Sequence, residues 1–438
     1  MKVMFDPFGS IVRIQRPAGN LSDIHKAGYG SVLLDMRTGC PANYFLHMTR
    51  ERNQAKAEGF AFLPDEPFRM EEVMKAFLDA CHRENLDVDG ALVPVLPSDR
   101  SNPQMNDFQQ GLSLEGVKYA LKAGCKWCIV PPLFAGIPLE EEKTRNMDFY
   151  RSFIPVLKEA SSTGFRILLE NECRDHGGHL VRGILSDPRE AAEWLEELNA
   201  EAMDALGYEA FGICLNIGHA NICGQDVDEM TPVLQKYIGA VVLTDNNGHE
   251  DGEYLPFGSA SKGVGANFAG ENTNWRSVIR GLRKIHYDGP LIFSMADTLW
   301  TIPVFVRPQL LVFSKTIAEF FIWQLTMEQT IAKYSHVVLF GAGNMCRNYM
   351  MDYGEKYPPL FTCDNNSKRW GEEFCGLKIE SPEKLKDLPE DTGIFICNEF
   401  YTEIRAQLES MGIKSGIEYF SDRYPNTEAR KRLKGLWK

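Results

Sequence analysis

Two kinds of segment alternate along the first three quarters of the chain. Short runs rich in Val, Ile, Leu and Phe are typical of buried strands, and the segments between them repeat apolar residues with helical spacing. The expected strands cover residues 3–5, 31–34, 92–95, 127–130, 166–169, 212–215, 240–243 and 291–293. The expected helices include 70–84, 114–123, 149–161, 187–198 and 275–285. Eight strands with interposed helices favour an α/β fold of the closed (β/α)8 TIM barrel type, and an open doubly wound sheet is the alternative.

The pattern changes after residue 310. A helix is expected over 310–334, and a new strand, glycine turn and helix follow it without a Gly-, Pro- or Ser-rich linker. This new strand is expected at 337–340. Further strands are expected at 360–363, 393–397 and 417–420, with an amphipathic helix at 401–411. This second α/β segment has about half the length of a full dinucleotide-binding fold. We therefore expect two domains, a TIM barrel over residues 1–333 and a small Rossmann-like domain over 334–438.

Composition narrows the class of ligand. Of the 438 residues, 44% are hydrophobic and 24% are charged, which is typical of a globular protein. The 60 acidic and 47 basic side chains give a formal net charge of −13, which disfavours binding to nucleic acid or to an anionic membrane. The most apolar stretch, 308–326, contains Lys315 and Glu319 and has a helical period, so we expect a packed helix and no membrane span. A soluble protein with a small-molecule ligand is expected, as a monomer or a homo-oligomer.

The cysteines indicate a reducing compartment. The chain has 11 of them, an odd number, and its N-terminus lacks the apolar region of a secretory signal. Cys125 and Cys128 form the one close pair in the sequence, and they lead into a strand rather than opening a helix as a redox pair does. We therefore expect free thiols and a cytoplasmic protein.

Polar residues at the carboxyl ends of the barrel strands are the candidates for chemistry, because the active sites of TIM barrels lie there. Such residues follow the fifth, sixth and seventh expected strands: Glu170, Asn216, His219, Asp245, His249, Asp251 and Glu253. Carboxylates and imidazoles that meet at one edge can bind a divalent ion or transfer a proton. The alternative is that they cap helices and close loops, for which Asp245-Asn246-Asn247-Gly248 is a suitable turn sequence.

Five motifs in the expected order give the chain a resemblance to a known family. They are ILLENE, CLNIGHA, VVLTDN, YLPFG, and Asn274-Trp275 followed by YDGPL. Over residues 3–333 the chain resembles the xylose isomerase-like TIM barrel family, which includes sugar isomerases and epimerases, inosose dehydratases and endonuclease IV. The resemblance implies proton transfer on a carbohydrate or polyol. It also implies a divalent ion (Mn, Mg or Zn), held by Glu, Asp, His and Glu on strands five to eight, that polarises a carbonyl and hydroxyl pair.

The chain departs from this ligand pattern. Glu170 matches the first metal ligand, but Asn216, Val242 and Ser294 stand where the family has Asp, His and Glu. Asn is a weak neutral ligand and Val is none, so a tight metal site of the family type is not expected unless nearby loop residues substitute. Three residues are candidates for this substitution: His249, Asp251 and Asp297.

Two functions remain open for the barrel. His219 is retained from the family's Asp-x-x-His motif, and the resemblance implies that it contacts substrate hydroxyls. We assign catalytic roles to Glu170, as the base that removes a proton next to a carbonyl, and to His219. We assign substrate binding to His176, Asn216, Asp245, His249 and Asp251. The alternative is a barrel that binds a sugar without turning it over, because loss of the metal ligands and of the second carboxylate removes groups that lower the barrier.

The second domain opens with a glycine turn between a strand and a helix, in the sequence Phe340-Gly341-Ala342-Gly343-Asn344. Asp364 lies 21 residues after Gly343, the spacing of a ribose-binding carboxylate, and the turn would hold a phosphate. Cys346 replaces the third glycine of this fingerprint. The run over 363–385 resembles the small Rossmann-type domain of nucleotide-sugar acyltransferases. The sequence thus predicts a site for NAD or a nucleotide-sugar, with a sugar oxidoreductase as the rival function, or else a structural module.

Overall fold

The computed structural model describes residues 1–10, 18–39, 70–94, 103–134, 137–159, 164–257 and 273–421. These residues belong to two compact units, one of which includes Met1–Glu319 while the other begins at Phe320. The division falls within the long helix α12 (Arg307–Ile331). The barrel boundary expected at residue 333 lies just after the C-terminal end of the same helix.

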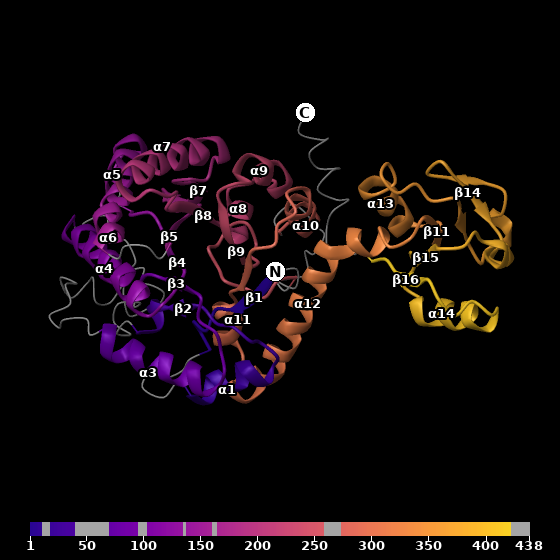
Figure 1. The fold of residues 1–438 in the computed structure, drawn as a ribbon, viewed down its shortest axis with the longest axis horizontal. Coiled ribbons are helices and arrows are strands. Elements are labelled where there is room, and N and C mark those ends of the chain that lie inside the picture. Colours follow the sequence, from indigo (N-terminus) through magenta and orange to yellow (C-terminus); the bar gives the residue numbers. More distant parts are fainter. Residues whose placement is uncertain are drawn as a thin grey trace. The chain divides into compact units, whose positions relative to one another are not determined.

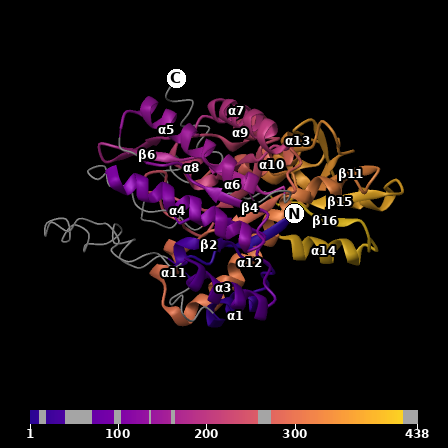
Figure 2. The same ribbon diagram turned by 60° about the vertical axis from the view of Figure 1, so that its left-hand side comes forward.

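The first unit contains a sheet of eight parallel strands with helices on the outside (Figures 1 and 2). The strands are β1 (Lys2–Phe5), β2 (Leu34–Asp35), β3 (Gly90–Leu92), β4 (Trp127–Val130), β5 (Arg166–Glu170), β8 (Phe211–Asn216), β9 (Ile238–Leu243) and β10 (Pro290–Phe293). Their order is β1-β10-β9-β8-β5-β4-β3-β2, and a parallel bridge between Phe5 and Val32 joins β1 to the segment that leads into β2. The sheet therefore curls into a TIM barrel, which confirms the expected fold class.

The helices of this unit follow the strands along the chain. They are α1 (Ala18–Lys26), α3 (Met70–Arg83), α4 (Pro103–Lys122), α5 (Leu139–Arg151), α6 (Phe153–Glu159), α7 (Pro188–Leu206), α8 (Ile217–Ile222), α9 (Val227–Leu234), α10 (Trp275–Lys284) and α11 (Ala296–Thr301), with short 3₁₀ turns at η1 (Met36–Gly39) and η4 (Val304–Val306). Helix α7 shows how the local sequence sets these bounds. Asp187 accepts hydrogen bonds from the first-turn amides of Arg189 and Glu190, Pro188 occupies the first turn, and Gly207 ends the helix at a φ of 81°.

Most expected elements are confirmed, and the differences have local causes. The helix expected over 149–161 is divided into α5 and α6, because Pro155 lacks the N–H that would continue one helix through this point. The strand expected over 92–95 begins earlier and ends at Leu92, and residue 95 lies outside the described residues. A hairpin of β6 (Cys173–His176) and β7 (His179–Arg182) was not expected; Gly177 and Gly178, with φ of 66° and 89°, form its turn.

Apolar side chains fill the interior of the barrel. Ten buried residues form this cluster: Met4, Leu33, Leu92, Trp127, Ile129, Leu168, Cys214, Ala240, Val242 and Ile292. They come from all eight strands or from the residues that lead into them, as in other TIM barrels whose interior is a packed core rather than a pore. Charged residues such as Glu170, the last residue of β5, lie at the carboxyl ends of the strands.

Helix α12 is long and rich in apolar residues. Together with η4 it forms the stretch Val304–Ile331, which is long and apolar enough by length and composition to cross a membrane, and no second such stretch exists among the described residues. Within the first unit, Ser314 of this helix is buried and its hydroxyl lies 2.8 Å from the hydroxyl of Tyr29. One helix of this kind is weak evidence for a membrane span, because core helices meet the same criterion.

The second unit is built around a mixed sheet of six strands. They are β11 (His336–Phe340), β12 (Thr362–Cys363), β13 (Glu373–Phe374), β14 (Leu377–Glu380), β15 (Thr392–Ile396) and β16 (Ile417–Tyr419). The sheet order is β13-β14-β12-β11-β15-β16, and all pairs are parallel except β13 with β14. Its helices are α13 (Asn344–Asp352), α14 (Tyr401–Ser410), and the 3₁₀ turns η5 (Ser367–Arg369) and η6 (Pro382–Asp387). The C-terminal half of α12 also belongs here, because Met327 and Ile331 are fully buried in the core of this unit.

Candidate active site

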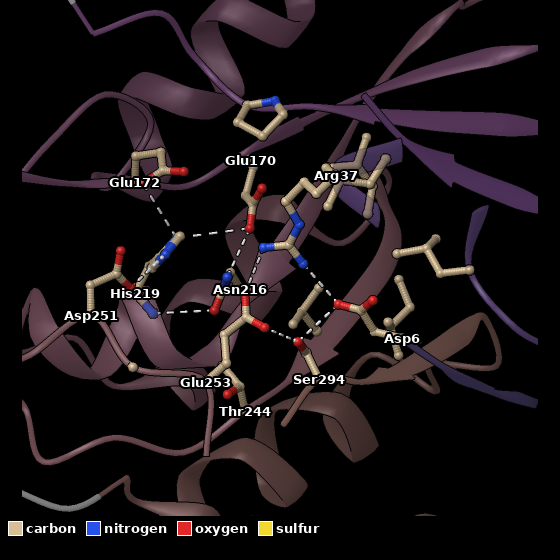
Figure 3. A pocket seen from close by; sticks show the side chains of 17 residues that line it. Asp6, Arg37, Glu170, Glu172, Asn216, His219, Thr244, Asp251, Glu253 and Ser294 are labelled. Atoms are coloured by element: carbon tan, nitrogen blue, oxygen red, sulfur yellow. Dashed lines mark hydrogen bonds and ion pairs between the residues drawn. The ribbon is translucent and has the colours of Figure 1, made fainter. Parts of the chain in front are cut away.

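A cavity of about 160 Å³ lies at the carboxyl ends of the barrel strands (Figure 3). This volume holds on the order of ten water molecules, or a small polyol. Apolar residues of the barrel interior line one side, among them Leu33, Ile129, Val242 and Ile292. The remaining lining is polar and strongly charged: Asp6, Arg37, Glu170, Glu172, Asn216, His219, Thr244, Asp251, Glu253 and Ser294. An apolar wall with convergent charged groups is the usual composition of a ligand site.

Glu170 is the last residue of β5, and its side chain is held in the cavity by Asn216. The side-chain amide of Asn216 donates a hydrogen bond of 2.8 Å to the Glu170 carboxylate. Asn171 fixes Asn216 in turn, with two hydrogen bonds of 2.7 and 3.0 Å to its backbone. Burial raises the pKa of Glu170, while the charge of His219 and the hydrogen bond from Asn216 oppose this shift. A buried carboxylate with a raised pKa is a stronger base at neutral pH than an exposed one.

His219 lies on α8 and is surrounded by carboxylates. Its Nδ1 is 2.7 Å from the carbonyl oxygen of Asn171, and because a carbonyl only accepts, this nitrogen carries a proton. The same nitrogen is 3.6 Å from Glu172, and Nε2 is 3.2 Å from Asp251. Burial opposes protonation, but Glu172 and Asp251 outweigh it and raise the pKa of His219 well above its ordinary value. The imidazole is therefore cationic at neutral pH and can donate a proton.

Arg37 forms the second charged centre of the cavity. Its guanidinium contacts Asp6 at 2.9 Å, Asp35 at 2.7 Å and Glu253 at 2.7 Å. Ser294 closes the cluster, since its hydroxyl lies 2.9 Å from Asp6 and 2.6 Å from Glu253. Burial and the neighbouring Asp35 raise the pKa of Asp6 well above its usual range. Carboxylates from three segments of the barrel thus meet at one guanidinium group, and Ser294 links two of them.

The ion pairs of His219 give a testable pH dependence of stability. Because the folded-state pKa of His219 is raised above its ordinary 6.5, its charge stabilises the protein fully below about pH 6.5, and this contribution is lost as the pH rises through the folded-state pKa. We expect His219→Gln to lower the free energy of unfolding by about 2 kcal/mol near pH 6, and by less at alkaline pH. Urea denaturation of both proteins across this range measures the difference.

His176→Gln is the control for this series, since His176 is exposed on the β6–β7 hairpin. It should leave the free energy of unfolding unchanged across the same pH range. A deficit of His219→Gln that grows with rising pH would contradict the assignment of a stabilising imidazolium.

The predicted substrate-binding residues separate into two groups. Asn216 and Asp251 line the cavity together with Glu170 and His219. His176 and His249 are exposed, on the hairpin and on the loop after β9, and neither is among the residues that line the cavity. Asp245 is buried and closes this loop instead. Its carboxylate accepts a 2.7 Å hydrogen bond from Thr273, and its backbone pairs with that of Tyr254.

Four charged residues of the cavity have no role assigned from the sequence. Asp6 directly follows β1, while Arg37 and Glu172 each lie two residues after the ends of β2 and β5. The active sites of TIM barrels lie at the carboxyl ends of the strands. A search for charged residues after every expected strand, including the first two, would therefore have identified all three. The sequence places Glu253 in the loop after β9. Its contact with Ser294, which lies 41 positions later in the chain, could not be predicted from the sequence.

The four strand-end positions at which the resemblance implies metal ligands do not form a metal cage. Glu170 offers a carboxylate, but the side-chain oxygen of Asn216 already accepts a hydrogen bond from the backbone N–H of His219, at 3.2 Å. Val242 contributes only apolar atoms to the cavity, and Ser294 is engaged with Asp6 and Glu253. One anionic ligand at four positions does not fit a divalent ion.

A second group of metal-ligand types lies beside the first. Glu172, Cys173 and His219 bring one carboxylate oxygen, one sulfur and one imidazole nitrogen within 4.8 Å of one another. These are donors that suit Zn²⁺, but metal binding requires a thiolate and an unprotonated imidazole nitrogen. Burial raises the pKa of the Cys173 thiol, and the His219 Nδ1 is hydrogen-bonded to Asn171. Burial also raises the pKa of the Glu172 carboxyl well above its ordinary range, so none of the three side chains is poised to act as a ligand in the described geometry.

The glycine turn of the second unit is occupied by its own chain. The Asp364 carboxylate, predicted to hold a ribose, accepts a 3.2 Å hydrogen bond from the backbone N–H of Ala342, at the centre of the turn. Arg369 donates a 2.8 Å hydrogen bond to the carbonyl oxygen of Ala342. An amide that would otherwise face a phosphate is therefore paired with a carboxylate. This geometry gives no support to a nucleotide cofactor at Gly341, Gly343 and Asp364.

Gly341 is required by the backbone of this turn. Its φ of 119° is outside the range of ordinary L-residues, and an added Cβ would lie 2.8 Å from the carbonyl oxygen of Cys397. We expect Gly341→Ala to destabilise the second unit by about 1–3 kcal/mol, because backbone strain and a close contact combine. Gly343→Ala is a matched control, since an added Cβ there meets open space at an ordinary φ. Equal stability of the two variants in thermal denaturation would contradict the described turn.

Comparison with known proteins agrees with this fold. A family model described as "Xylose isomerase-like TIM barrel" matches residues 53–303, which is more than half of the chain. A second model, "C2185-like, N-terminal", matches residues 333–416. No curated protein matches the chain.

Solved structures give the same result for the barrel. An L-ribulose 3-epimerase is 12% identical with a TM-score of 0.50, and the match covers 76% of this chain and 98% of that one. A D-tagatose 3-epimerase-like protein (17%, TM-score 0.48) and a 3-keto-D-glucoside 4-epimerase from E. coli (15%, TM-score 0.44) also match. They cover 75% and 72% of this chain and 99% of each of theirs. At these identities the likeness to the solved structures concerns the fold alone. The family model, which matches more than half of the chain, places this chain in the xylose isomerase-like TIM barrel family.

Proposed function

We propose that the barrel catalyses proton transfer on a sugar or polyol, as an isomerase or epimerase, with Glu170 as the base. The observation that carries this proposal is the position of Glu170, whose buried carboxylate lines the cavity, is oriented by Asn216 and lies 3.9 Å from the cationic His219. A base beside a proton donor within one cavity is the arrangement that enolisation requires. The sugar epimerases of the same fold support the choice of this reaction class over others.

The residues have distinct roles in this reaction. The Glu170 carboxylate removes the proton from the carbon next to a carbonyl group. The electron pair of that C–H bond forms a C=C double bond, and the π pair of the carbonyl group moves onto its oxygen. His219 donates a proton to this oxygen, which yields an enediol. Addition of a proton to the former carbonyl carbon, with loss of the proton of the neighbouring hydroxyl group, gives isomerisation. Addition to the opposite face of the carbon that lost its proton, with return of the enol proton to His219, gives epimerisation. Glu253 also lines the cavity, but its carboxylate accepts hydrogen bonds from Arg37 and Ser294 and carries no proton, so the proton for the opposite face comes from water.

The charges of the cavity support an uncharged substrate. Five carboxylates line it against two cationic side chains: Asp6, Glu170, Glu172, Asp251 and Glu253 against Arg37 and His219. Both cations are already paired with carboxylates. A phosphate group would enter an excess of negative charge, whereas hydroxyl groups can donate hydrogen bonds to carboxylates. We therefore propose a neutral ketose or cyclic polyol ketone rather than a sugar phosphate.

Deuterium exchange tests the function even when the product is unidentified. Neutral ketoses, aldoses and inososes are incubated with the protein in D₂O, and NMR follows loss of the C–H signal next to the carbonyl. We expect exchange with at least one neutral sugar and none with its phosphate ester. A sugar that raises the melting temperature without any exchange would instead favour a non-catalytic binding protein.

The second unit adds a structural proposal. The five parallel strands of its sheet have the order third, second, first, fourth, fifth along the chain, which supports a Rossmann-like topology. Because Asp364 and Arg369 occupy the glycine turn, we propose that this domain does not serve the barrel with a nucleotide.

A further inference from the structure

The cavity contains a cationic side chain, Arg37, near the positions at which members of this fold family hold a metal ion. Arg37 lines the same cavity as the four strand-end positions Glu170, Asn216, Val242 and Ser294. Figure 3 shows its guanidinium extending between Glu170 and Asp6, with Glu253 beside it. We propose that Arg37 is the fixed cation of this site, in place of a divalent ion, so that the site works without metal.

The carboxylates around Arg37 come from three different segments. Asp6 follows β1, Asp35 ends β2, and Glu253 lies on the loop after β9, which approaches β10 through Ser294. The exposed fractions of the Asp6 and Asp35 side chains are 3% and 0%, and that of Arg37 is 15%. A set of converging carboxylates of this kind is what a divalent ion takes. Here every one of them contacts the guanidinium.

Hydrogen bonds and a ring contact fix the orientation of the Arg37 guanidinium. Its Nε and Nη2 both contact the Asp35 carboxylate, at 2.8 and 2.7 Å, in a side-on geometry that only a planar guanidinium can make. Nη1 donates to Glu253 at 2.7 Å, and the guanidinium carbon lies 4.1 Å from the centre of the Phe8 ring. These contacts hold the guanidinium at three of its nitrogen atoms and against the Phe8 ring.

An added divalent ion would find its ligands occupied. Asp6 and Glu253 are each bound by Arg37 and by Ser294, and Asn216 uses its side-chain oxygen for the backbone of His219. An ion would also experience repulsion from the guanidinium at short range. The consequence for the mechanism, which rests on the proposed function, is that the oxygen of the substrate carbonyl is stabilised by N–H donors of Arg37 and His219.

Metal binding by the wild-type protein is the first test, and it needs no substrate. The full chain is stripped with a chelator and titrated with Mn²⁺, Mg²⁺ and Zn²⁺, each alone, while calorimetry and the melting temperature are followed. We expect no stoichiometric binding and no rise in melting temperature. Stoichiometric binding that is lost in Glu170→Gln or in Cys173→Ser would overturn the proposal and would locate the ion at one of the two ligand groups described above.

A gain of metal binding in an Arg37 variant is the second test. Arg37→Ala leaves Asp6, Asp35 and Glu253 without their cation, so we expect it to bind Mn²⁺ more than tenfold more tightly than the wild type, with a Mn²⁺-dependent rise in melting temperature. Arg151→Ala is the control, because Arg151 also pairs with three carboxylates, Asp148, Glu197 and Glu201, but outside the cavity. A folded Arg37→Ala without any such gain would overturn the proposal. Should Arg37→Ala not fold, the wild-type titration decides.

These tests separate the inference from the proposed function. Deuterium exchange that persists in the presence of a chelator supports both the proposed function and the role of Arg37 as the cation. Exchange that requires an added metal ion overturns only the role of Arg37. A protein that exchanges no sugar and binds no ion overturns only the function.

Discussion

Glu170→Gln is expected to reduce deuterium exchange by about 10²–10⁴-fold, the usual contribution of a positioned general base. Glutamine has the size of glutamate and can still accept the 2.8 Å hydrogen bond from Asn216, so the geometry of the cavity is retained. It lacks the basic oxygen that removes the proton. The exchange rate of the best neutral sugar, measured by NMR in D₂O for wild type and variant, gives the ratio directly.

Two further variants make this result specific. Glu142→Gln removes another buried carboxylate, which pairs with Arg174 at 3.6 Å and does not line the cavity, and it should exchange at the wild-type rate. Glu172→Gln removes the carboxylate next to His219 and should have an intermediate effect, since the donor loses one of its ion pairs. Exchange by Glu170→Gln within tenfold of wild type would remove Glu170 from the mechanism.

Arg37→Met should lower the free energy of unfolding by about 3–5 kcal/mol, the largest effect on stability that we expect of a single substitution in the cavity. Methionine preserves much of the apolar stem but leaves Asp6 and Asp35 buried without a cation. Urea denaturation at neutral pH measures the loss. Buried carboxylates without partners have raised pKa values and destabilise the protein when ionised, so the deficit should shrink as the pH falls toward the ordinary carboxyl pKa near 4.

Arg151→Met is the matched control for this measurement. Its partners Asp148, Glu197 and Glu201 are largely exposed, so the expected change is at most about 1 kcal/mol. An equal loss of unfolding free energy in the two variants would contradict the claim that burial makes the ion pairs of Arg37 more stabilising than those of Arg151.

The barrel could be predicted because its strands are short, apolar and separated by helices. The runs 127–130 and 167–169 contain no charged residue, and both lie in strands of the sheet. The β6–β7 hairpin has no such pattern. Most of its residues are exposed and most are polar, and only the Gly177-Gly178 turn indicates it. Pairing of exposed residues over a two-residue turn leaves little trace in hydrophobic periodicity.

The site was predictable where a residue ends its strand or closely follows it. Glu170 and Asn216 are the last residues of β5 and β8, His219 lies three residues after β8, and the structure brings all three together in the cavity. The partnership of Arg37 with Glu253 joins residues 216 positions apart, and only the closure of the barrel brings them into contact. His249 and Asp251 are two residues apart on one loop, yet only Asp251 lines the cavity, because the path of a loop is not set by local sequence.

Helix α12 determines how this protein can be divided for experiments. Trp323 stacks on Tyr419, Gln324 donates to the backbone of Ser421, and Met327 and Ile331 complete the core of the second unit. A fragment that starts at residue 334 would lack these four side chains and expose the apolar surface they cover. A fragment that starts near residue 320 retains them. Separate expression of the two units therefore requires a fragment boundary inside α12, although domain boundaries are usually placed in exposed linkers.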